Sequence, residues 1–199
     1  MMHLARYILI LFAAIILFCA EVTAQDLPAK SDSLFNVGRK LFALSVEDKN
    51  QIKPAIDLFN KIIDDKGNFL HNRALVYIGA LHTIKAKHTF FPFDKLKWAK
   101  EGLSIMDNAL SLAPEDIEVL FVHGTICYNL PGLFKREDDA RRNFHKIVEL
   151  LPDNIHRYDK YFIADVLDYL DNKISLTKED QKVISKINSN FSIASGEIE

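Results

Sequence analysis

Apolar residues recur along most of the chain at the three- and four-residue spacing of amphipathic helices. One such stretch is residues 54–65, where Ile56, Phe59, Ile62 and Ile63 form a single stripe. Alternating patterns typical of strands are almost absent. The pattern therefore predicts an all-α chain, with helices over residues 31–44, 54–65, 71–86, 94–112, 115–129, 136–151, 155–171 and 178–190.

A glycine begins the same arrangement of small and large residues at three places along the chain. The glycines are Gly38, Gly79 and Gly124, each inside the first of two consecutive predicted helices. The second helix then carries a small residue, a large apolar residue four positions later and another core residue three further on. These sets are Ala55, Phe59 and Ile62; Gly102, Met106 and Ala109; and Ala140, Phe144 and Ile147. Repetition at fixed spacing predicts stacked helical hairpins, because one hairpin alone cannot bury its apolar face.

This skeleton resembles the tetratricopeptide repeat (TPR), which pairs leucine with glycine in its first helix and has alanine, phenylalanine and a closing proline in its second. The corresponding glycine pairs here are Val37-Gly38, Ile78-Gly79 and His123-Gly124. The resemblance covers residues 31–171 and extends to exported bacterial helical-repeat proteins. It implies a right-handed α-α solenoid of about three TPR-like hairpins, followed by C-terminal capping helices.

The resemblance also implies a partner-binding groove, because the first helix of each TPR hairpin lines the concave wall. Arg39 is the one cation among the expected wall positions, so the carboxylate clamp of some TPR proteins is not expected. An apolar and aromatic wall suits an amphipathic helix of a partner. The alternative is that the seventh helix or a neighbouring chain covers the wall. The expected wall residues are Phe35, Arg39, Phe42, Val76, Ala80, Thr83, Phe121, Thr125 and Tyr128.

Two hairpin turns are longer than the repeat requires. Successive glycines lie 41 and 45 residues apart instead of the family's 34, and the surplus falls within residues 87–93 and 129–136. Equivalent turns of a solenoid emerge along one edge, so we expect their apolar residues to form one docking rim for a partner or a membrane surface. The alternative is that these residues fold under and close the core. The rim residues are Phe90, Phe91, Phe93, Leu130, Leu133 and Phe134.

The first 24 residues have the features of a secretory signal peptide. An unbroken apolar run of 14 residues extends from Tyr7 to Ala20, and small residues precede a cleavage site at Ala24. An uncleaved anchor is the alternative, but spanning a bilayer needs roughly 20 residues. We expect export to the periplasm after cleavage near Ala24, a flexible segment over 25–30, a TPR-like domain over 31–190 and a disordered tail over 191–199.

The charge pattern and motifs predict binding rather than catalysis. A formal net charge of −2 does not favour nucleic acid, and no glycine-rich phosphate loop or nucleophile elbow is present in the sequence. His123 and Cys127 have a spacing that zinc sites use, but two ligands do not make a site. We expect no enzyme activity, cofactor or metal, and interpret the chain as a protein–protein interaction module (a scaffold or adaptor) for another envelope protein or peptide segment. The alternative is a periplasmic binding protein for a small apolar ligand held between the hairpins.

Overall fold

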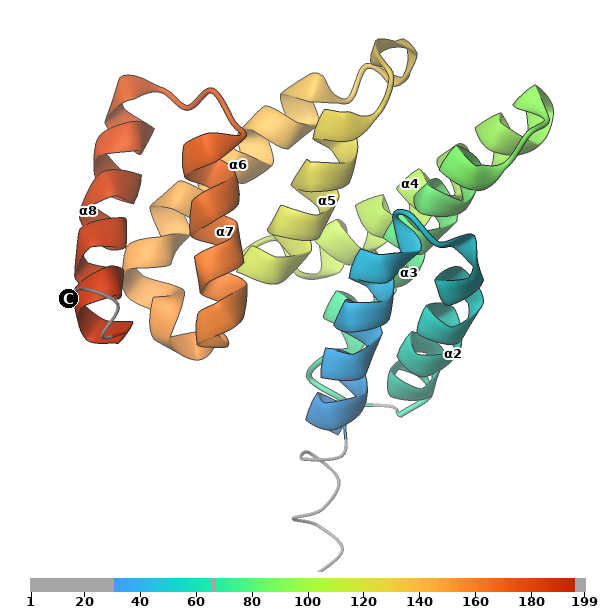
Figure 1. The fold of residues 1–199 in the computed structure, drawn as a ribbon, viewed down its shortest axis with the longest axis horizontal. Helices are drawn as coiled ribbons and strands as arrows, with labels where there is room; N and C mark the ends of the chain where they lie inside the picture. Colours follow the sequence, from blue (N-terminus) through green and yellow to red (C-terminus); the bar gives the residue numbers. More distant parts are fainter. Residues whose placement is uncertain (1–30, 66, 196–199) are drawn as a thin grey trace, which may run out of the picture.

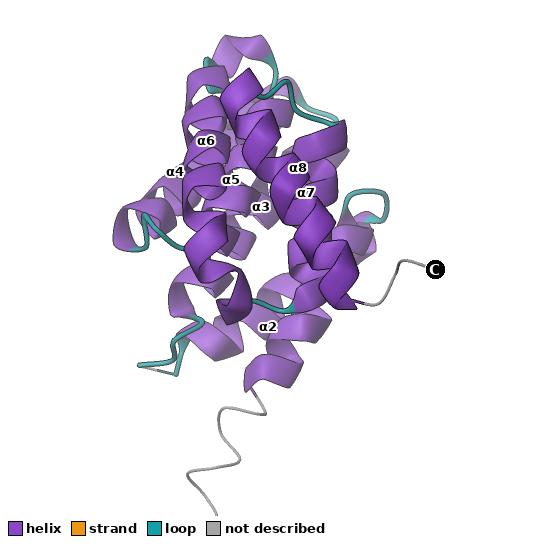
Figure 2. Cartoon of the chain, turned by 90° about the vertical axis from the view of Figure 1, so that its left-hand side faces the viewer, coloured by secondary structure: helices purple, strands orange, loops and turns teal. Residues whose placement is uncertain are grey.

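The computed structural model describes residues 31–65 and 67–195, and their regular structure is helical throughout, with no strand among them (Figures 1 and 2). The predicted signal peptide (1–24) and flexible segment (25–30) lie outside the described residues. The N-terminal helix covers residues 31–45. It is followed by η1 (Lys49–Gln51), α2 (Ile52–Ile63), α3 (His71–His88), α4 (Pro92–Leu112), α5 (Ile117–Asn129), η2 (Gly132–Phe134), α6 (Glu137–Asn154), η3 (Ile155–Arg157), α7 (Lys160–Asn172) and α8 (Lys178–Ser195).

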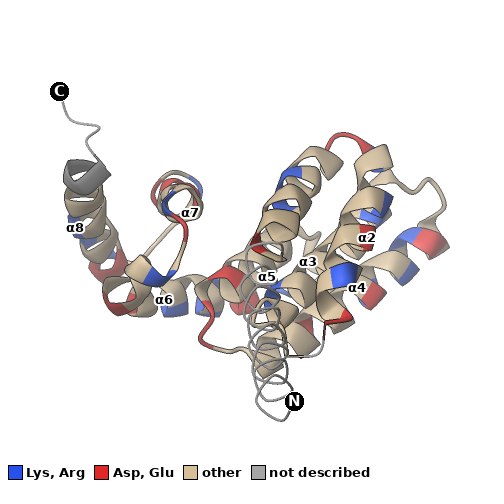
Figure 3. Cartoon of the chain, turned by 90° about the horizontal axis from the view of Figure 1, so that it is seen from below, with Lys and Arg blue, Asp and Glu red and all other residues tan. Residues whose placement is uncertain are grey.

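Most helices that are consecutive in sequence pack side by side, and both α3 and α5 lie at the centre of the packing. The α3 helix contacts α2, α4 and α5, while α5 contacts α3, α4 and α6. At the other end of the molecule α8 packs against both α6 and α7 (Figure 1). Charged residues of both signs are interspersed on the helices (Figure 3). The core is therefore a continuous apolar layer that runs through α2, α3, α4, α5 and α6 and ends at α7 and α8.

The closest helix crossing joins α3 to α4 at two glycines. A Cβ atom added to Gly79 would lie 2.6 Å from Met106 Cγ and 2.7 Å from the Gly102 carbonyl oxygen. A Cβ added to Gly102 would lie 2.4 Å from the Gly79 carbonyl oxygen and 2.8 Å from the Thr83 nitrogen. The two backbones meet where neither helix carries a side chain, as the spacing predicted.

The other two glycines contact the equivalent large residue of the following helix. A Cβ on Gly38 would lie 2.8 Å from the Phe59 ring, and one on Gly124 would lie 2.9 Å from the Phe144 ring. Ala140 is buried as expected, although the atoms nearest to Gly124 belong to Phe144 and Asn143. Among these three sets the expected approach of the glycine to the small residue is seen at Gly79 and Gly102, whereas at Gly38 and Gly124 the large residue lies nearest, which the spacing did not predict.

Several helix ends differ from the predicted ones because capping groups decide them. The seventh helix begins at Lys160 instead of residue 155, since Asp159 Oδ1 accepts the N–H groups of Tyr161 and Phe162 at 2.9 and 3.2 Å. The preceding residues, 155–157, form the short helix η3. At the C-terminus α8 continues to Ser195, so the predicted tail over 191–199 starts inside a helix.

Candidate functional site

Four of the predicted groove positions belong to the core. Phe35, Val76, Ala80 and Thr83 are all buried, with at most 7% of each residue exposed. The three residues of α3 are buried because α2, α4 and α5 enclose that helix, and Phe35 of the N-terminal helix packs against the rings of Phe59 and Tyr77. An open groove along this part of the wall is therefore a wrong expectation.

The aromatic positions of the wall are covered by neighbouring rings. The half-buried Phe42 contacts Tyr77 edge to face, with ring centroids 4.9 Å apart. Phe121 contacts two rings of α7, Phe162 at 5.9 Å and Tyr169 at 5.5 Å. The seventh helix thus covers the wall over the third hairpin, which is the alternative considered from the sequence.

Two further wall residues, Thr125 and Tyr128, also lie beside α7. Thr125 is a half-buried residue of α5. Asn129, one turn later on the same helix, donates from Nδ2 to the Thr125 carbonyl at 2.8 Å and to Tyr169 Oη of α7 at 3.2 Å. Tyr128 is 46% exposed and its hydroxyl lies 3.5 Å from the Lys173 carbonyl. Tyr128 is therefore the one predicted wall residue whose side chain is largely accessible.

A buried charge cluster occupies the centre of the wall. Glu118 of α5 is fully buried, and its carboxylate accepts Arg39 Nε at 2.6 Å and Tyr77 Oη at 2.8 Å. Arg39 Nη2 contacts the second carboxylate oxygen, and Arg73 Nη1 lies 3.6 Å from it. Burial lowers the pKa of Arg39, but Glu118 outweighs this effect and leaves the pKa raised. Burial together with Glu118 raises the pKa of Tyr77 well above its ordinary value. Arg39 is thus a paired structural cation and not a free one.

Aromatic rings from the C-terminal half close over the two arginines. The guanidinium of Arg39 lies 5.2 Å from the Phe162 ring centre, and that of Arg73 lies 4.6 Å from the Tyr158 ring centre. Tyr158 Oη also accepts the N–H of Ile117 at 2.9 Å. The sequence carried a signal for this cluster, because Glu118 is an acidic residue inside an otherwise apolar helical stretch.

The predicted rim divides into an exposed part and a packed part. We call the turn formed by Phe90, Phe91, Pro92 and Phe93 the α3–α4 tip. The exposed fractions of its three phenylalanines are 87%, 65% and 89%. Leu133, in the α5–α6 turn, is 71% exposed.

Leu130 and Phe134 instead pack against the core, as the alternative for the rim proposed. The short helix η2 and the left-handed backbone of Lys135, at φ 54°, reverse the chain after Phe134. Both turns lie along the upper edge in Figure 1, where the α3–α4 turn reaches farther outward than α2. A single continuous rim is therefore not formed, and the accessible aromatic surface is the α3–α4 tip.

His123 takes part in a polar cluster between α4, α5 and α6. Asn143 Nδ2 lies 2.8 Å from His123 Nδ1, which assigns the imidazole proton to Nε2, and Nε2 donates to Asp107 Oδ1 at 2.9 Å. Burial lowers the pKa of His123, although Asp107 opposes this effect. Burial raises the pKa of Asp107, but hydrogen bonds from Arg136 and His123 outweigh it and leave the pKa lowered. Both lowered pKa values favour a neutral His123 and an ionised Asp107 at neutral pH.

Cys127 lies next to this cluster, with Sγ 3.6 Å from His123 Nδ1. The order thiol, imidazole and carboxylate is that of a nucleophilic triad, but both Cys127 and His123 are only 1% exposed. Burial raises the pKa of the Cys127 thiol to about 11, so the thiolate is scarce at neutral pH. Among the described residues no group of three or more His, Cys, Asp or Glu side chains is placed to hold a metal ion.

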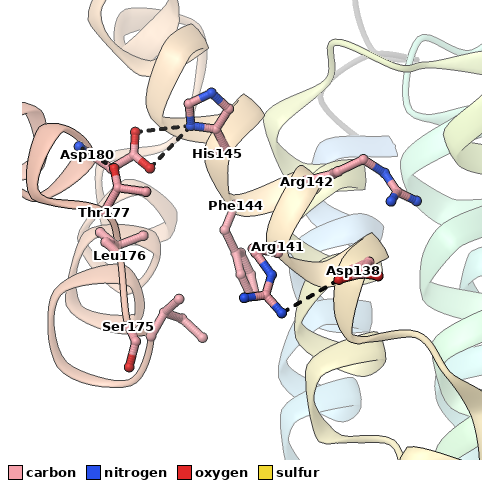
Figure 4. Close-up of a pocket in the computed structure, with 10 residues that line it drawn as sticks. Asp138, Arg141, Arg142, Phe144, His145, Ser175, Leu176, Thr177 and Asp180 are labelled. Carbon is pink, nitrogen blue, oxygen red and sulfur yellow. Dashed lines mark hydrogen bonds and ion pairs between the residues drawn. The ribbon is translucent and has the colours of Figure 1, made fainter.

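An open cleft of about 550 Å³ separates α6 from the α7–α8 connection, and we call it the α6–α8 cleft (Figure 4). Its floor is apolar and its edges carry both signs of charge. Thr177 caps the start of α8, since its Oγ1 accepts the N–H of Asp180 at 3.1 Å. The lining residues are Asp138, Arg141, Arg142, Phe144, His145, Ile174, Ser175, Leu176, Thr177 and Asp180.

Two polar pairs flank this cleft. His145 Nδ1 lies 3.1 Å from Asp180 Oδ1 and joins α6 to α8 at one end. Arg141 points into the cleft and lies 3.6 Å from Asp138, whereas Arg142 points away (Figure 4). This cleft could not be predicted from the sequence. It forms between α6 and the α7–α8 connection, which are about 30 residues apart in the chain, and no local pattern shows that they lie close together.

No helix among the described residues is long and apolar enough to cross a membrane. Comparisons of the chain with protein-family models, with curated proteins and with solved structures found no match to any of them.

Proposed function

We propose that the protein is a non-catalytic protein–protein interaction module of the bacterial envelope, built as a right-handed TPR-like solenoid and exported after cleavage near Ala24. Three equivalent glycine contacts, at Gly38, Gly79 and Gly124, support the repeat. The buried state of Cys127 and His123 supports a non-catalytic role, because substrate has no access to either group.

The partner site in this proposal is the α6–α8 cleft, and its composition is the observation that carries the proposal. A polypeptide segment supplies apolar side chains, charges of both signs and backbone hydrogen-bonding groups in one ligand. The cleft offers the complementary set, namely Phe144 and Leu176 on the floor, Arg141 and Asp138 at one edge and the His145–Asp180 pair at the other. The wall of the first helices is filled, so the partner does not bind where other TPR proteins hold peptides.

A small apolar ligand suits this cleft less well. Such a ligand would remove water from the exposed Arg141 and Asp138 without offering hydrogen bonds in return, and burying an uncompensated polar group costs about 1–3 kcal/mol. A peptide can satisfy these groups, because it carries its own donors and acceptors.

The proposal is tested by crosslinking and affinity recovery from envelope fractions with two matched variants. Arg141→Glu reverses the charge at the cleft edge, and we expect recovery of the partner protein to fall at least about tenfold. Lys146→Glu is the control, because Lys146 is on the same helix, forms a similar pair with Glu149 at 3.1 Å and does not line the cleft. Equal recovery with both variants, or a non-protein molecule that co-purifies and is displaced by Arg141→Glu, would overturn the proposal.

A further inference from the structure

The α3–α4 tip extends beyond α2 because α3 and α4 are both longer than that helix. At 1.5 Å per residue, the 21 residues of α4 span about 31 Å, whereas the 12 residues of α2 span about 18 Å. Pro92 starts α4 directly after the extended backbone of Phe91, so the chain reverses at the outermost point. The phenylalanines of the tip are therefore carried outward, where no second layer of helices can cover them (Figure 1).

A basic cleft lies at the base of the tip, between η1, the first turn of α2 and the last turn of α3. It has a volume of about 450 Å³ and ends at Thr89, the residue before Phe90. Its ionisable residues are Lys49, Lys53, Lys85 and His88, and none of the described residues that line it is acidic. His88 is held by its Nε2, which lies 2.9 Å from the Ser45 carbonyl.

Acidic residues near this cleft offset part of its charge. Lys53 pairs with Asp57 at 2.6 Å and Lys87 with Glu47 at 3.1 Å, while Asp48 interacts electrostatically with His88. Asp94 follows Phe93 directly, and Lys95 and Lys97 come next. Lysines therefore flank the phenylalanines on both sides and outnumber the carboxylates near them.

We propose that the α3–α4 tip and the basic cleft together bind the surface of an anionic phospholipid bilayer. The phenylalanines lie outermost and the lysines of the basic cleft lie behind them. A membrane surface has the matching order, because its acyl chains lie deeper than its charged headgroups. Aromatic rings favour the boundary between headgroups and acyl chains, and lysines are attracted to anionic headgroups. The cleft would hold the phosphate of a headgroup while Phe90 and Phe93 enter the boundary. This site shares no residue with the α6–α8 cleft and goes beyond the proposed function.

The test is flotation of the full chain with vesicles of phosphatidylcholine, prepared with and without phosphatidylglycerol. We expect binding to the vesicles that contain phosphatidylglycerol, and a reduction of at least about tenfold for the Phe90→Ser/Phe93→Ser variant. Phe69→Ser is the matched control, because Phe69 is also largely exposed but lies on the α2–α3 connection. All variants keep residues 1–30, so any contribution of the apolar run within them is the same.

Two further measurements separate the tip from the cleft. Lys49→Ala and Lys53→Ala should each weaken binding about fivefold, whereas Lys182→Ala on α8 should not. A tryptophan introduced by Phe93→Trp should shift its emission to shorter wavelength on adding the vesicles, and one introduced by Phe69→Trp should not. Equal binding to vesicles without phosphatidylglycerol, equal binding by the Phe90→Ser/Phe93→Ser variant, or loss of a protein partner in that variant with vesicle binding unchanged would each overturn the proposal.

Discussion

Arg39 Nε donates to Glu118 Oε1 at 2.6 Å and so ties the N-terminal helix to α5 across 79 positions of sequence. Because Glu118 is fully buried, no water can replace the hydrogen bonds that Arg39 donates to its carboxylate. We predict that Arg39→Ala lowers the free energy of unfolding by about 3 kcal/mol, as expected when a buried ion pair loses one member. Urea denaturation of the two proteins measures the difference.

An exposed ion pair provides the control for this prediction. Lys53→Ala removes a pair with Asp57 whose members are largely exposed, and we expect a change of less than about 1 kcal/mol. If Arg39→Ala were no more destabilising than Lys53→Ala, the buried cluster would not organise the wall.

The α3–α4 crossing should tolerate no added side chain. Gly79→Ala and Gly102→Ala each place a Cβ less than 3 Å from the backbone of the other helix, and backbone cannot move aside as a ring can. We predict a loss of about 1–3 kcal/mol for each variant in the free energy of unfolding. Gly132→Ala should be close to neutral, since the nearest atom to its added Cβ is a side-chain oxygen 3.9 Å away.

We expect smaller losses in the free energy of unfolding for Gly38→Ala and Gly124→Ala. The atoms nearest to an added Cβ at Gly38 and Gly124 are ring carbons of Phe59 and Phe144, which can shift slightly. A larger loss for Gly38→Ala or Gly124→Ala than for Gly102→Ala would contradict the described geometry.

Local spacing predicted the helices, because a helix depends on residues close in sequence. The repeated interval also predicted the close approach of Gly79 and Gly102, but it did not predict that Phe144 lies nearer to Gly124 than Ala140 does. The open wall was a wrong expectation, because its exposure depends on α3 being enclosed and on where α7 comes to lie. The residues near Phe35 and Val76 in sequence do not indicate which other helices cover these two side chains. The α6–α8 cleft was missed for the same reason.

The His123 cluster should make the fold sensitive to acid. The pKa of His123 is lowered from an ordinary value of 6.5, so its contribution to stability is fully present above 6.5 and is lost as the pH falls through the folded value. The lowered pKa of Asp107 acts in the same direction below 3.8. We predict that His123→Gln flattens the decline in unfolding free energy between pH about 7 and pH about 5. An unchanged slope in that variant would show that another group is responsible.

The Cys127 thiol should be inert in the folded protein. Burial raises its pKa to about 11 and excludes reagents, so an aromatic disulfide reagent should react with it only after unfolding. The measurement uses a Cys19→Ser background, which leaves one thiol in the chain. Labelling at equal rates with and without urea would mean that the cluster opens readily in the native state.

Site-specific photocrosslinking in envelope preparations shows whether a partner polypeptide occupies the α6–α8 cleft. A photoreactive residue at Ser175, which lines the cleft, should form an adduct with one contiguous peptide segment, and Arg141→Glu should abolish it. The same group at Ser111, an exposed position on α4 outside the cleft, should not form that adduct. Equal adducts at Ser111 and Ser175, or an adduct at Ser175 that contains no peptide, would contradict the account.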